Sequence, residues 1–265
     1  MSDDGSVLLT EDKDGIRILT LNRPKARNCL SMDLMTAIRS ALADAATTDK
    51  VRAIVLTGAG PAFSSGHDLK EMTAHRNDPD KGRGFYTETM RTCAELMLAI
   101  VRLPKPVIAA VNGIATAAGC QLVASCDLAV AATDARFATP GVNIGLFCST
   151  PMVALSRNLS RKAAMEMLLL GEMVGAEDAL RLGLVNRVVP ADEVVNQAVA
   201  FGRKIASKPF RTLKIGKDAF YRQAELPLDE AYRYTAEVMV ENMLDAEAEE
   251  GIGAFLDKRE PKWPR

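Results

Sequence analysis

Residues that bind metals or form disulfides are scarce in this sequence. Its 265 residues include two histidines and five cysteines, and no two cysteines have the Cys-x-x-Cys spacing. Two histidines exclude a multi-histidine metal site, and an odd number of unclustered cysteines argues against a disulfide framework and against structural zinc. Free cysteines are typical of a reducing compartment. We therefore expect a cytoplasmic protein that holds no metal.

A surplus of charge and a long hydrophobic run are missing as well. Lys and Arg together number 33 and Asp and Glu 34, which gives a net charge of -1, so we expect no nucleic-acid partner. The most apolar region, residues 107–132, is interrupted by Asn112, Gln121 and Asp127, which indicates a buried core and no membrane span. Residues 1–5 are acidic and polar and lack the features of a signal peptide.

The composition that remains is that of a globular protein, with 48% hydrophobic and 25% charged residues. Short apolar runs predict strands at residues 7–10, 16–21, 51–57, 107–111, 128–132 and 185–189. A long loop is expected over residues 63–84. Helical periodicity predicts helices after Ser31, over 85–103, near Cys120, and over 161–170, 176–182, 192–207, 212–223 and 228–243. We predict an α/β core in residues 1–195 and a helical region in residues 196–265.

Two strand-to-helix junctions carry the main functional signal. They are residues 62–69 (AFSSGHDL) and 112–121 (NGIATAAGCQ), and both place small residues where a helix should begin. Helix N-termini leave backbone N–H groups unpaired and carry a partial positive charge, so two such ends facing one another could hold a developing oxyanion. Small residues would equally allow a helix to pack tightly on a sheet. Spacing alone favours this packing interpretation.

Six segments change that balance, because together they resemble one family over essentially the whole chain. They are NRPKARNCLS (22–31), AFSSGHDLKEM (62–72), PVIAAVNGIATAAGCQL (106–122), CDLAVA (126–131), GEMVGAEDALRLGLVNRVVP (171–190) and AFLDKREP (254–261). The sequence resembles the enoyl-CoA hydratase/isomerase, or crotonase, superfamily, and its SSGHDLKE and GLFCSTP runs are most similar to one branch of it. The resemblance implies an α/β fold, a crotonase-like spiral of ββα units with a helical C-terminal region that trimerises.

The resemblance also implies a ligand and its contacts. The ligand is an acyl-CoA thioester bound by a homo-oligomer, a trimer or a dimer of trimers, and no cofactor is implied beyond the coenzyme A of the substrate. Backbone N–H groups at the positions of His67 and Ala118 hold the thioester oxygen as an enolate forms, and losing one such donor costs ~10²–10³ in rate. The positions that match CoA-contacting residues, the last two often in a neighbouring subunit, are Lys25, Ala26, Arg27, Ser64, Ser65, Asp68, Phe255 and Lys258.

Three positions depart from the catalytic pattern of the family. Its hydratases divide acid and base work between two glutamates, at positions that match Gln121 and Gly141. Gln121 can orient a water or a carbonyl but cannot exchange a proton, and Gly141 has no side chain. Some relatives carry an aspartate where Ser149 stands, and a serine hydroxyl is a weak nucleophile without an adjacent base. Ordinary enoyl-CoA hydratase turnover is therefore not expected.

Other carboxylates or an imidazole could supply the missing proton transfer. His67 has a suitable intrinsic pKa, although a ring at the rim of the pocket with no proton role is the simpler interpretation. Asp68 and Glu71 could act as bases, but solvation of the loop is the simpler role for Asp68.

Thiols and hydroxyls near the acyl region have structural interpretations. Cys120 and Cys148 flank that region by motif position, and free cysteines usually behave as small buried hydrophobes. Ser149 and Thr150 are expected to cap the helix that Pro151 begins, since proline is favoured in the first turn of a helix.

Two classes of function stay open at this point. One is an enzyme that stabilises an enolate of an acyl-CoA thioester, with a lyase, isomerase or thioester-hydrolase outcome. The other is a binding module that keeps the grip on CoA and has lost catalysis. Gln121 and Gly141 are the residues on which the choice depends.

Overall fold

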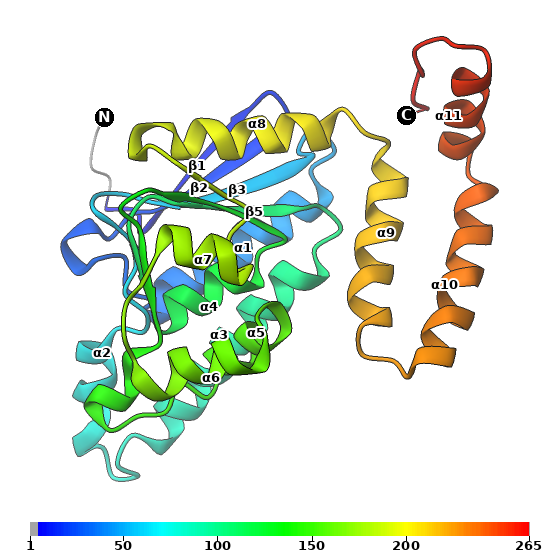
Figure 1. Cartoon of the computed structure of the whole chain (residues 1–265). Helices are drawn as coiled ribbons and strands as arrows, with labels where there is room; N and C mark the ends of the chain where they lie inside the picture. The colour runs from blue at the N-terminus through cyan, green and yellow to red at the C-terminus, as the bar shows by residue number, and fades with distance from the viewer. Residues whose placement is uncertain (1–4, 265) are drawn as a thin grey trace. The chain divides into compact units, whose positions relative to one another are not determined.

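The computed structural model describes residues 5–264, and the chain forms two compact units, unit 1 up to Arg203 and unit 2 from Lys204 onward (Figure 1). Both sheets belong to unit 1, whereas unit 2 is helical. The first four residues, on which part of the signal-peptide expectation rests, lie outside the described residues. In the part of the chain that the structure describes, no helix is both long and apolar enough to cross a bilayer.

Unit 1 is built on a six-stranded sheet in the order β1-β2-β3-β5-β7-β10. β1 (Leu8–Lys13) and β2 (Ile16–Leu21) pair as an antiparallel hairpin, and the remaining strands follow β2 in parallel. These are β3 (Ala53–Gly58), β5 (Val107–Val111), β7 (Leu128–Ala132) and β10 (Arg187–Val189). All of β5 and the first five residues of β3 are buried, as is typical of a parallel sheet covered on both faces.

A second, smaller sheet runs beside the first in the order β4-β6-β8-β9. Its strands are β4 (Ala62–Ser64), β6 (Ile114–Thr116), β8 (Arg136–Ala138) and β9 (Val174–Gly175). The strands β3, β5 and β7 of the large sheet are each followed within a few residues by one strand of the small sheet and then by a helix or 3-10 helix. This threefold ββα repeat confirms the predicted spiral fold.

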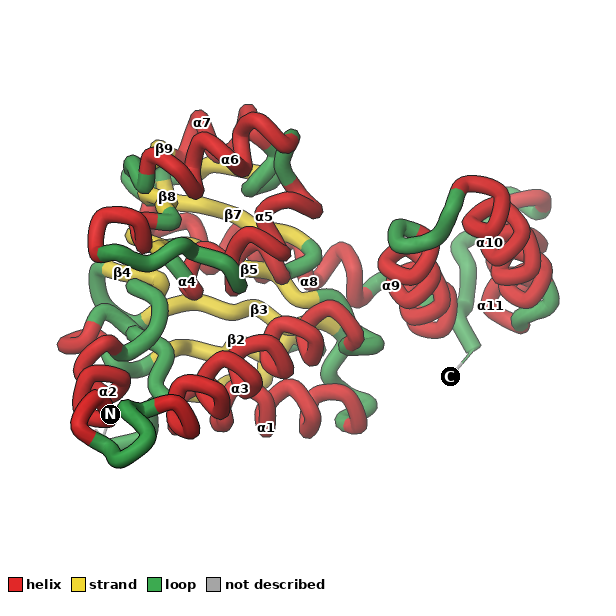
Figure 2. The backbone as a smooth tube through the Cα atoms, turned by 90° about the horizontal axis from the view of Figure 1, so that it is seen from below, coloured by secondary structure: helices red, strands yellow, loops and turns green. Residues whose placement is uncertain are grey.

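Helices cover the sheets of unit 1 (Figure 2). α1 and α3 lie side by side on one face of the large sheet. The helices are α1 (Met32–Thr47), α2 (Leu69–Ala74), α3 (Arg83–Arg102), α4 (Ala118–Ser125), α5 (Pro151–Asn158), α6 (Arg161–Leu170), α7 (Ala176–Leu182) and α8 (Val194–Ala206). The 3-10 turns are η1 (Pro24–Ala26), η2 (His75–Asn77), η3 (Pro140–Ile144) and η4 (Ala191–Glu193).

α1 begins where the sequence predicts, because the Ser31 hydroxyl accepts a hydrogen bond from the N–H of Leu34 at 3.3 Å. The predicted loop over residues 63–84 is wrong over much of its length, because its ends belong to β4 and α3 and its middle contains α2 and η2. Asp68 starts α2, since its carboxylate accepts from the N–H groups of Lys70 and Glu71. A six-residue helix with no buried residue gives no periodic apolar signal, which is why the pattern missed it.

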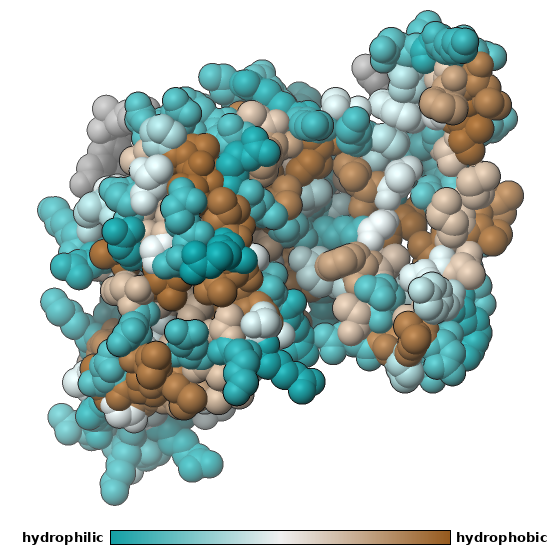
Figure 3. Space-filling view, in the orientation of Figure 1, coloured by the Kyte–Doolittle hydropathy of each residue, from teal (hydrophilic) through white to brown (hydrophobic). Residues whose placement is uncertain are grey.

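Unit 2 holds three helices, α9 (Phe210–Gln223), α10 (Leu228–Met243) and α11 (Ala246–Leu256). The sequence pattern predicted the first two. Glu247 in α11 is buried and accepts from the N–H groups of Arg211 and Thr212, so it closes the first turn of α9. Figure 3 shows hydrophobic surface over α10 and α11.

The predicted division at residues 195 and 196 falls in the first turn of α8. The contacts separate the units later, after Arg203. The buried face of α8, formed by Val194, Ala198 and Gly202, accounts for the difference, because a Cβ at Gly202 would lie 2.9 Å from the Ile16 side chain of β2. Most of α8 therefore packs against the large sheet and belongs to unit 1.

Candidate active site

The loop between β2 and α1 pairs with the loop between β4 and α2. The Ser65 N–H donates to the Arg27 carbonyl at 3.0 Å, and the Leu30 N–H donates to the Gly66 carbonyl at 2.7 Å. The Asp68 N–H returns a bond of 3.3 Å to the Leu30 carbonyl. This short parallel bridge brings two sets of the predicted CoA-contacting residues together.

Two buried polar side chains fix that arrangement. Asn28 Nδ2 donates to the carbonyls of Ala59 and Ala62, at 2.9 and 2.7 Å, and its Oδ1 accepts from the Arg23 N–H. The Ser64 hydroxyl donates to the Asn28 carbonyl at 2.8 Å. Neither Asn28 nor Ser64 is exposed, so Ser64 lies beneath the loop and its hydroxyl is committed to the backbone.

The two predicted junctions lie against one another at glycines. A Cβ at Gly119 would lie 2.2 Å from the Ser64 carbonyl oxygen, so α4 approaches β4 as closely as backbones allow. A Cβ at Gly66 would lie 2.8 Å from the Ala117 Cβ and 3.2 Å from the Ala118 nitrogen. The positive φ of Gly66, 91°, adds a conformational need for glycine. Residues 66–67 and 117–118 are therefore immediate neighbours.

The amides at this junction are poorly satisfied. Ala117 precedes α4 with φ 50° and ψ -120°, an uncommon conformation for a residue with a side chain, and its N–H donates to Ala138. Ala118 is the first residue of the helix, where N–H groups have no intrahelical acceptor. Within residues 5–264, neither the Ala118 N–H nor the His67 N–H has an acceptor. Such a pair of free donors could bind a carbonyl oxygen or an enolate.

The imidazole of His67 is enclosed beside these donors. Neither ring nitrogen has a hydrogen-bond partner in the described part of the chain. Burial lowers the pKa of His67, with a smaller opposing effect from the Leu30 backbone. Burial therefore favours the neutral ring, and a location of His67 at the rim of the pocket with no proton role stays a prediction.

Gln121 follows Ala118 by one turn of α4 and is 4% exposed. Its Oε1 accepts from the Cys93 thiol of α3 at 3.9 Å. Its backbone carbonyl accepts from the Ser125 hydroxyl. Sequence reasoning missed Cys93, because nothing in its own segment marks it as a neighbour of Gln121.

Gly141 is buried in η3, and its surroundings are already filled. A Cβ there would lie 2.7 Å from the Leu146 carbonyl oxygen and 2.9 Å from the Cys148 sulfur. Its φ is not positive, so sterics and not conformation require glycine. The pKa of the Cys148 thiol is raised by burial, and burial also raises that of Cys120 to about 12. Both thiols are buried and protonated, as expected for small hydrophobes.

Ser149 does not sit in a nucleophile's environment. Its side chain is exposed, and its hydroxyl donates to the Phe147 carbonyl at 3.3 Å. The expected capping role is wrong, because α5 begins after Thr150 without any side-chain cap. Thr150 already has helical φ and ψ, which turns its hydroxyl away from the capping geometry, whereas Pro151 occupies the predicted first turn.

The acidic side chains near the loop are engaged elsewhere. Asp68 pairs with Arg23 at 2.9 Å and accepts from the Cys29 thiol at 3.2 Å. Burial alone would raise the pKa of Asp68, but the bonds from Arg23, Cys29 and the Glu71 N–H hold it below its usual value. Burial and the bond to Asp68 raise the pKa of Cys29 to about 11. The Glu71 carboxylate accepts from the Met32 N–H at the start of α1.

The remaining predicted contact residues lie on surfaces. Lys25 and Arg27 are exposed at η1, and Ala26 lies between them, partly exposed. Phe255, 81% exposed, and Lys258 lie at the end of α11 in unit 2. The structure thus groups the predicted CoA-contacting residues of unit 1 around one bridge between loops.

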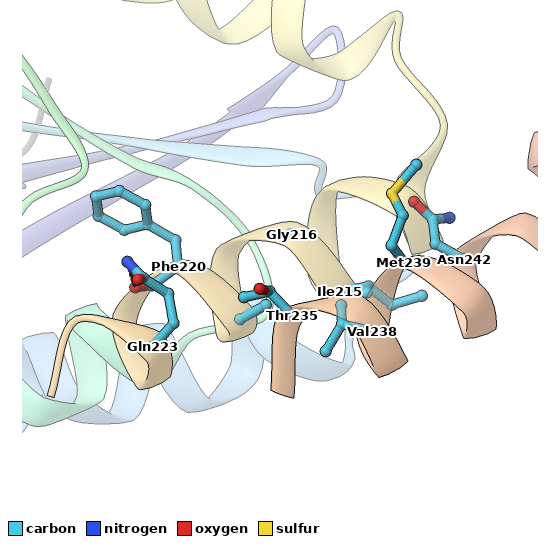
Figure 4. A pocket seen from close by; sticks show the side chains of 9 residues that line it. Ile215, Gly216, Phe220, Gln223, Thr235, Val238, Met239 and Asn242 are labelled. Carbon is cyan, nitrogen blue, oxygen red and sulfur yellow. Dashed lines mark hydrogen bonds between the residues drawn. The ribbon is translucent and has the colours of Figure 1, made fainter. Parts of the chain in front are cut away.

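A groove of about 370 Å³ lies in unit 2 between α9 and α10 (Figure 4). None of its lining side chains is titratable; they are Ile215, Gly216, Ala219, Phe220, Gln223, Thr235, Val238, Met239 and Asn242. It contains none of the predicted site residues, so the groove is not the candidate active site.

Comparison with known proteins gives the same family throughout. The family model described as enoyl-CoA hydratase/isomerase matches residues 11–265. The chain is 46% identical over 254 residues to the enoyl-CoA hydratase domain-containing protein 3, mitochondrial, of Rattus norvegicus, covering 96% of this chain and 83% of the relative. The corresponding protein of Homo sapiens is 47% identical over 250 residues, covering 94% and 81%.

Solved structures agree with the sequence relatives. The crystal structure of human enoyl Coenzyme A hydratase domain-containing protein 3 has a TM-score of 0.92 at 46% identity and covers 97% of this chain and 100% of its own. A crystal structure of an enoyl-CoA hydratase of Mycobacterium smegmatis has a TM-score of 0.92 at 52% identity, covering 97% and 99%. The family and the branch predicted from the SSGHDLKE and GLFCSTP runs are thereby confirmed.

The expected cytoplasmic location is contradicted by the names of the relatives. The relatives of Rattus norvegicus, Mus musculus, Homo sapiens and Xenopus laevis, at 45–47% identity, are all named as mitochondrial proteins. The expectation rested on free cysteines and on the polar first residues. Free thiols require only a reducing environment, so they could not single out the cytoplasm.

Proposed function

Because the chain belongs to the enoyl-CoA hydratase/isomerase family, we propose that unit 1 binds an acyl-CoA thioester and polarises its carbonyl with the backbone N–H groups of His67 and Ala118. The observation that carries the proposal is the contact of Gly66 with Ala117 and Ala118, which brings the two junctions together. Two amides without acceptors at the positive end of α4 suit an oxygen that gains negative charge.

The proposed CoA path follows the bridge between the two loops. Lys25 and Arg27 are exposed there and carry positive charge suited to CoA phosphates, while Ser65 and Asp68 lie on the facing loop. In this proposal Phe255 and Lys258 contact the CoA of a neighbouring subunit within a trimer or a dimer of trimers.

Hydration of an enoyl thioester is not part of the proposed function. Gln121 cannot exchange protons, and the space beside Gly141 is filled by Leu146 and Cys148. Asp68 and Glu71 are held by Arg23 and by the start of α1. These observations favour a second candidate within the same site, an acyl-CoA carrier without turnover.

The proposal can be tested on the amide itself. Proline is tolerated at the first position of a helix and has no N–H, so Ala118→Pro removes one donor at a position where α4 can accept it. Arg161→Pro is a matched control at the first position of α6. We expect isotope-edited infrared spectra to show the carbonyl stretch of bound butanoyl-CoA shifted to lower frequency in the wild type and in Arg161→Pro, but not in Ala118→Pro.

A carbonyl stretch that is unshifted in the wild type would contradict the proposal. Circular dichroism and the melting temperature check that Ala118→Pro folds. If it does not fold, the wild-type spectrum with butanoyl-CoA still decides the question, because only polarising donors lower that frequency. Crotonyl-CoA hydration, followed at the enoyl absorbance, tests the stated roles of Gln121 and Gly141: hydration at a rate typical of enzymes would contradict these roles and the acyl-CoA carrier.

A further inference from the structure

The contact between Cys93 and Gln121 sets the direction of an amide. Cys93 lies in the middle of α3 and has no exposed surface. Burial raises the pKa of its thiol to about 12, so it remains protonated and can donate. Its Sγ lies 3.9 Å from Gln121 Oε1, which makes the oxygen of the carboxamide the atom that faces α3.

The other end of the same carboxamide is left without a protein partner. Because the two terminal atoms of a planar amide diverge, Gln121 Nε2 faces away from Cys93. No acceptor for Nε2 exists among residues 5–264, and unlike the ring nitrogens of His67 this atom is not sealed from solvent. Gln121 lies three residues after Ala118, so both project from one face of α4. Gln121 Nε2 is therefore a third donor, carried on the same face of α4 as Ala118.

The two carboxylates that follow His67 most closely in the described chain, Asp68 and Glu71, are already bonded to other groups. Asp68 is bonded to Arg23, Cys29 and the first turn of α2, and Glu71 is bonded to the Met32 N–H. Gly141 contributes no side chain. A saturated or enoyl acyl chain presents only its thioester oxygen to such a site, which would leave Gln121 Nε2 unpaired. An unpaired donor costs binding free energy, whereas an acceptor placed opposite it recovers that cost.

We propose that Cys93 is a positioning residue that turns the Gln121 amide nitrogen into the site, and that the bound acyl thioester carries a second acceptor oxygen on or beyond its β carbon. A ketone or a carboxylate supplies that oxygen. The inference rests on the proposed function and adds the chemical class of the acyl group. In this arrangement His67 and Ala118 hold the thioester oxygen while Gln121 holds the second oxygen.

Calorimetry with three CoA thioesters tests the inference on the full-length protein. Butanoyl-CoA has no second acceptor, 3-oxobutanoyl-CoA has a neutral one, and malonyl-CoA has a charged one. We expect the wild type to bind at least one acceptor-bearing thioester about tenfold more tightly than butanoyl-CoA, as one added hydrogen bond predicts. The thioester with the higher affinity identifies the source of the oxygen.

Variants separate positioning from mere packing. Cys93→Ala removes the thiol donor and should reduce the tenfold preference to about threefold or less, since the amide can then turn over. Cys93→Ser keeps a donor and should restore the preference. Gln121→Met keeps the volume but has no N–H and should abolish it. Cys126→Ala is the matched control, because Cys126 is another buried thiol, at the end of α4, and it donates to the Leu122 carbonyl instead.

Equal affinity of the wild type for all three thioesters would overturn the inference, and so would a preference that survives both Cys93→Ala and Gln121→Met. Melting temperatures confirm that each variant folds, and a preference ratio does not respond to a uniform loss of stability. Failure of the proposed function has a different signature, an unpolarised thioester carbonyl in the wild type. Polarisation without a preference among thioesters would contradict this inference alone.

Discussion

The loops that carry His67 and Ala118 differ from the segment that follows β8, although both belong to the same candidate site. Around the amides, backbone bonds, Asn28 and close-packed glycines fix each peptide. From Pro140 to Thr150, a 3-10 turn leads into an exposed stretch that includes Ile144, Leu146 and Phe147. In the proposed function, the first region acts through main-chain groups, whereas the second would act through side chains.

The proposed function polarises a carbonyl without acid–base side chains, and the difference between the two regions gives a physical reason for that combination. Every residue except proline has a main-chain N–H, so the position of this group depends on packing, and packing at Gly66 and Gly119 leaves little choice of residue. Acid–base chemistry depends on the identity of a side chain, and one substitution removes it. At Gly141 the neighbouring carbonyl and thiol have taken up the space that a side chain would need.

The largest effect is expected from Gly119→Ala, which tests whether close packing preserves the amides. A Cβ placed 2.2 Å from the Ser64 carbonyl forces α4 away from β4, which we expect to cost about 3 kcal/mol and to abolish acyl-CoA binding. Chemical denaturation and calorimetry measure both. Gly216→Ala in α9 meets no atom within 4 Å and should be neutral or stabilising. Equal losses of stability and affinity in Gly119→Ala and Gly216→Ala would show that close packing at Gly119 does not hold the amides in place.

A smaller loss is expected at Gly141, in the other half of the site. Gly141→Ala brings a methyl group against the Leu146 carbonyl and the Cys148 sulfur and should cost about 2 kcal/mol in the free energy of unfolding. Cys148→Ala removes one of these contacts, so Gly141→Ala combined with Cys148→Ala should lose less stability than the sum of the single losses.

Because the space beside Gly141 is filled, Gln121→Glu combined with Gly141→Glu should not install crotonyl-CoA hydration. If this variant folds and hydrates crotonyl-CoA, residues 140–150 can rearrange to accept a side chain at position 141, which would contradict the prediction.

The ion pair beneath the first loop gives a pH-dependent test of how firmly that loop is held. Asp68→Asn keeps a capping oxygen for α2 but removes the charge facing Arg23, and we expect a loss of about 1 kcal/mol at pH 7. The native pKa of Asp68 lies below its unfolded value of about 3.9, so its contribution is complete above that value and disappears as the pH falls through the native pKa. Denaturation curves of the two proteins should therefore converge in acid. Curves that stay equally separated at all pH values would contradict this.

The smallest effect is expected from Ser149→Ala. The side chain is exposed and its hydroxyl bonds only to the nearby Phe147 carbonyl, so stability should change by less than about 0.5 kcal/mol. Affinity for butanoyl-CoA should be unchanged. A marked loss of affinity would assign Ser149 a role that its surroundings do not indicate.

Local patterns predicted the strands of the large sheet and most of the long helices, because buried faces repeat with a fixed period. They missed the four strands of the small sheet, which have only two or three residues each, and also α11. The motif at residues 112–121 likewise indicated the start of α4 and the close approach at Gly119. The ion pair between Arg23 and Asp68 and the contact between Cys93 and Gln121 join segments far apart in the chain. No period or spacing within one segment encodes such contacts. Sequence reasoning also placed a cap at Thr150, where backbone geometry does not allow one.

All five cysteines are buried, and three have thiol pKa values of about 11 or 12. Thiolates are the reactive form, so an alkylating reagent reaches them chiefly when a segment opens. Cys29 lies in the loop between β2 and α1, Cys93 in α3 and Cys120 in α4. The alkylation rate of each cysteine therefore reports how often its own segment opens. The order in which the three cysteines become alkylated would rank the rigidity of these segments, and no cysteine has to be introduced for the measurement.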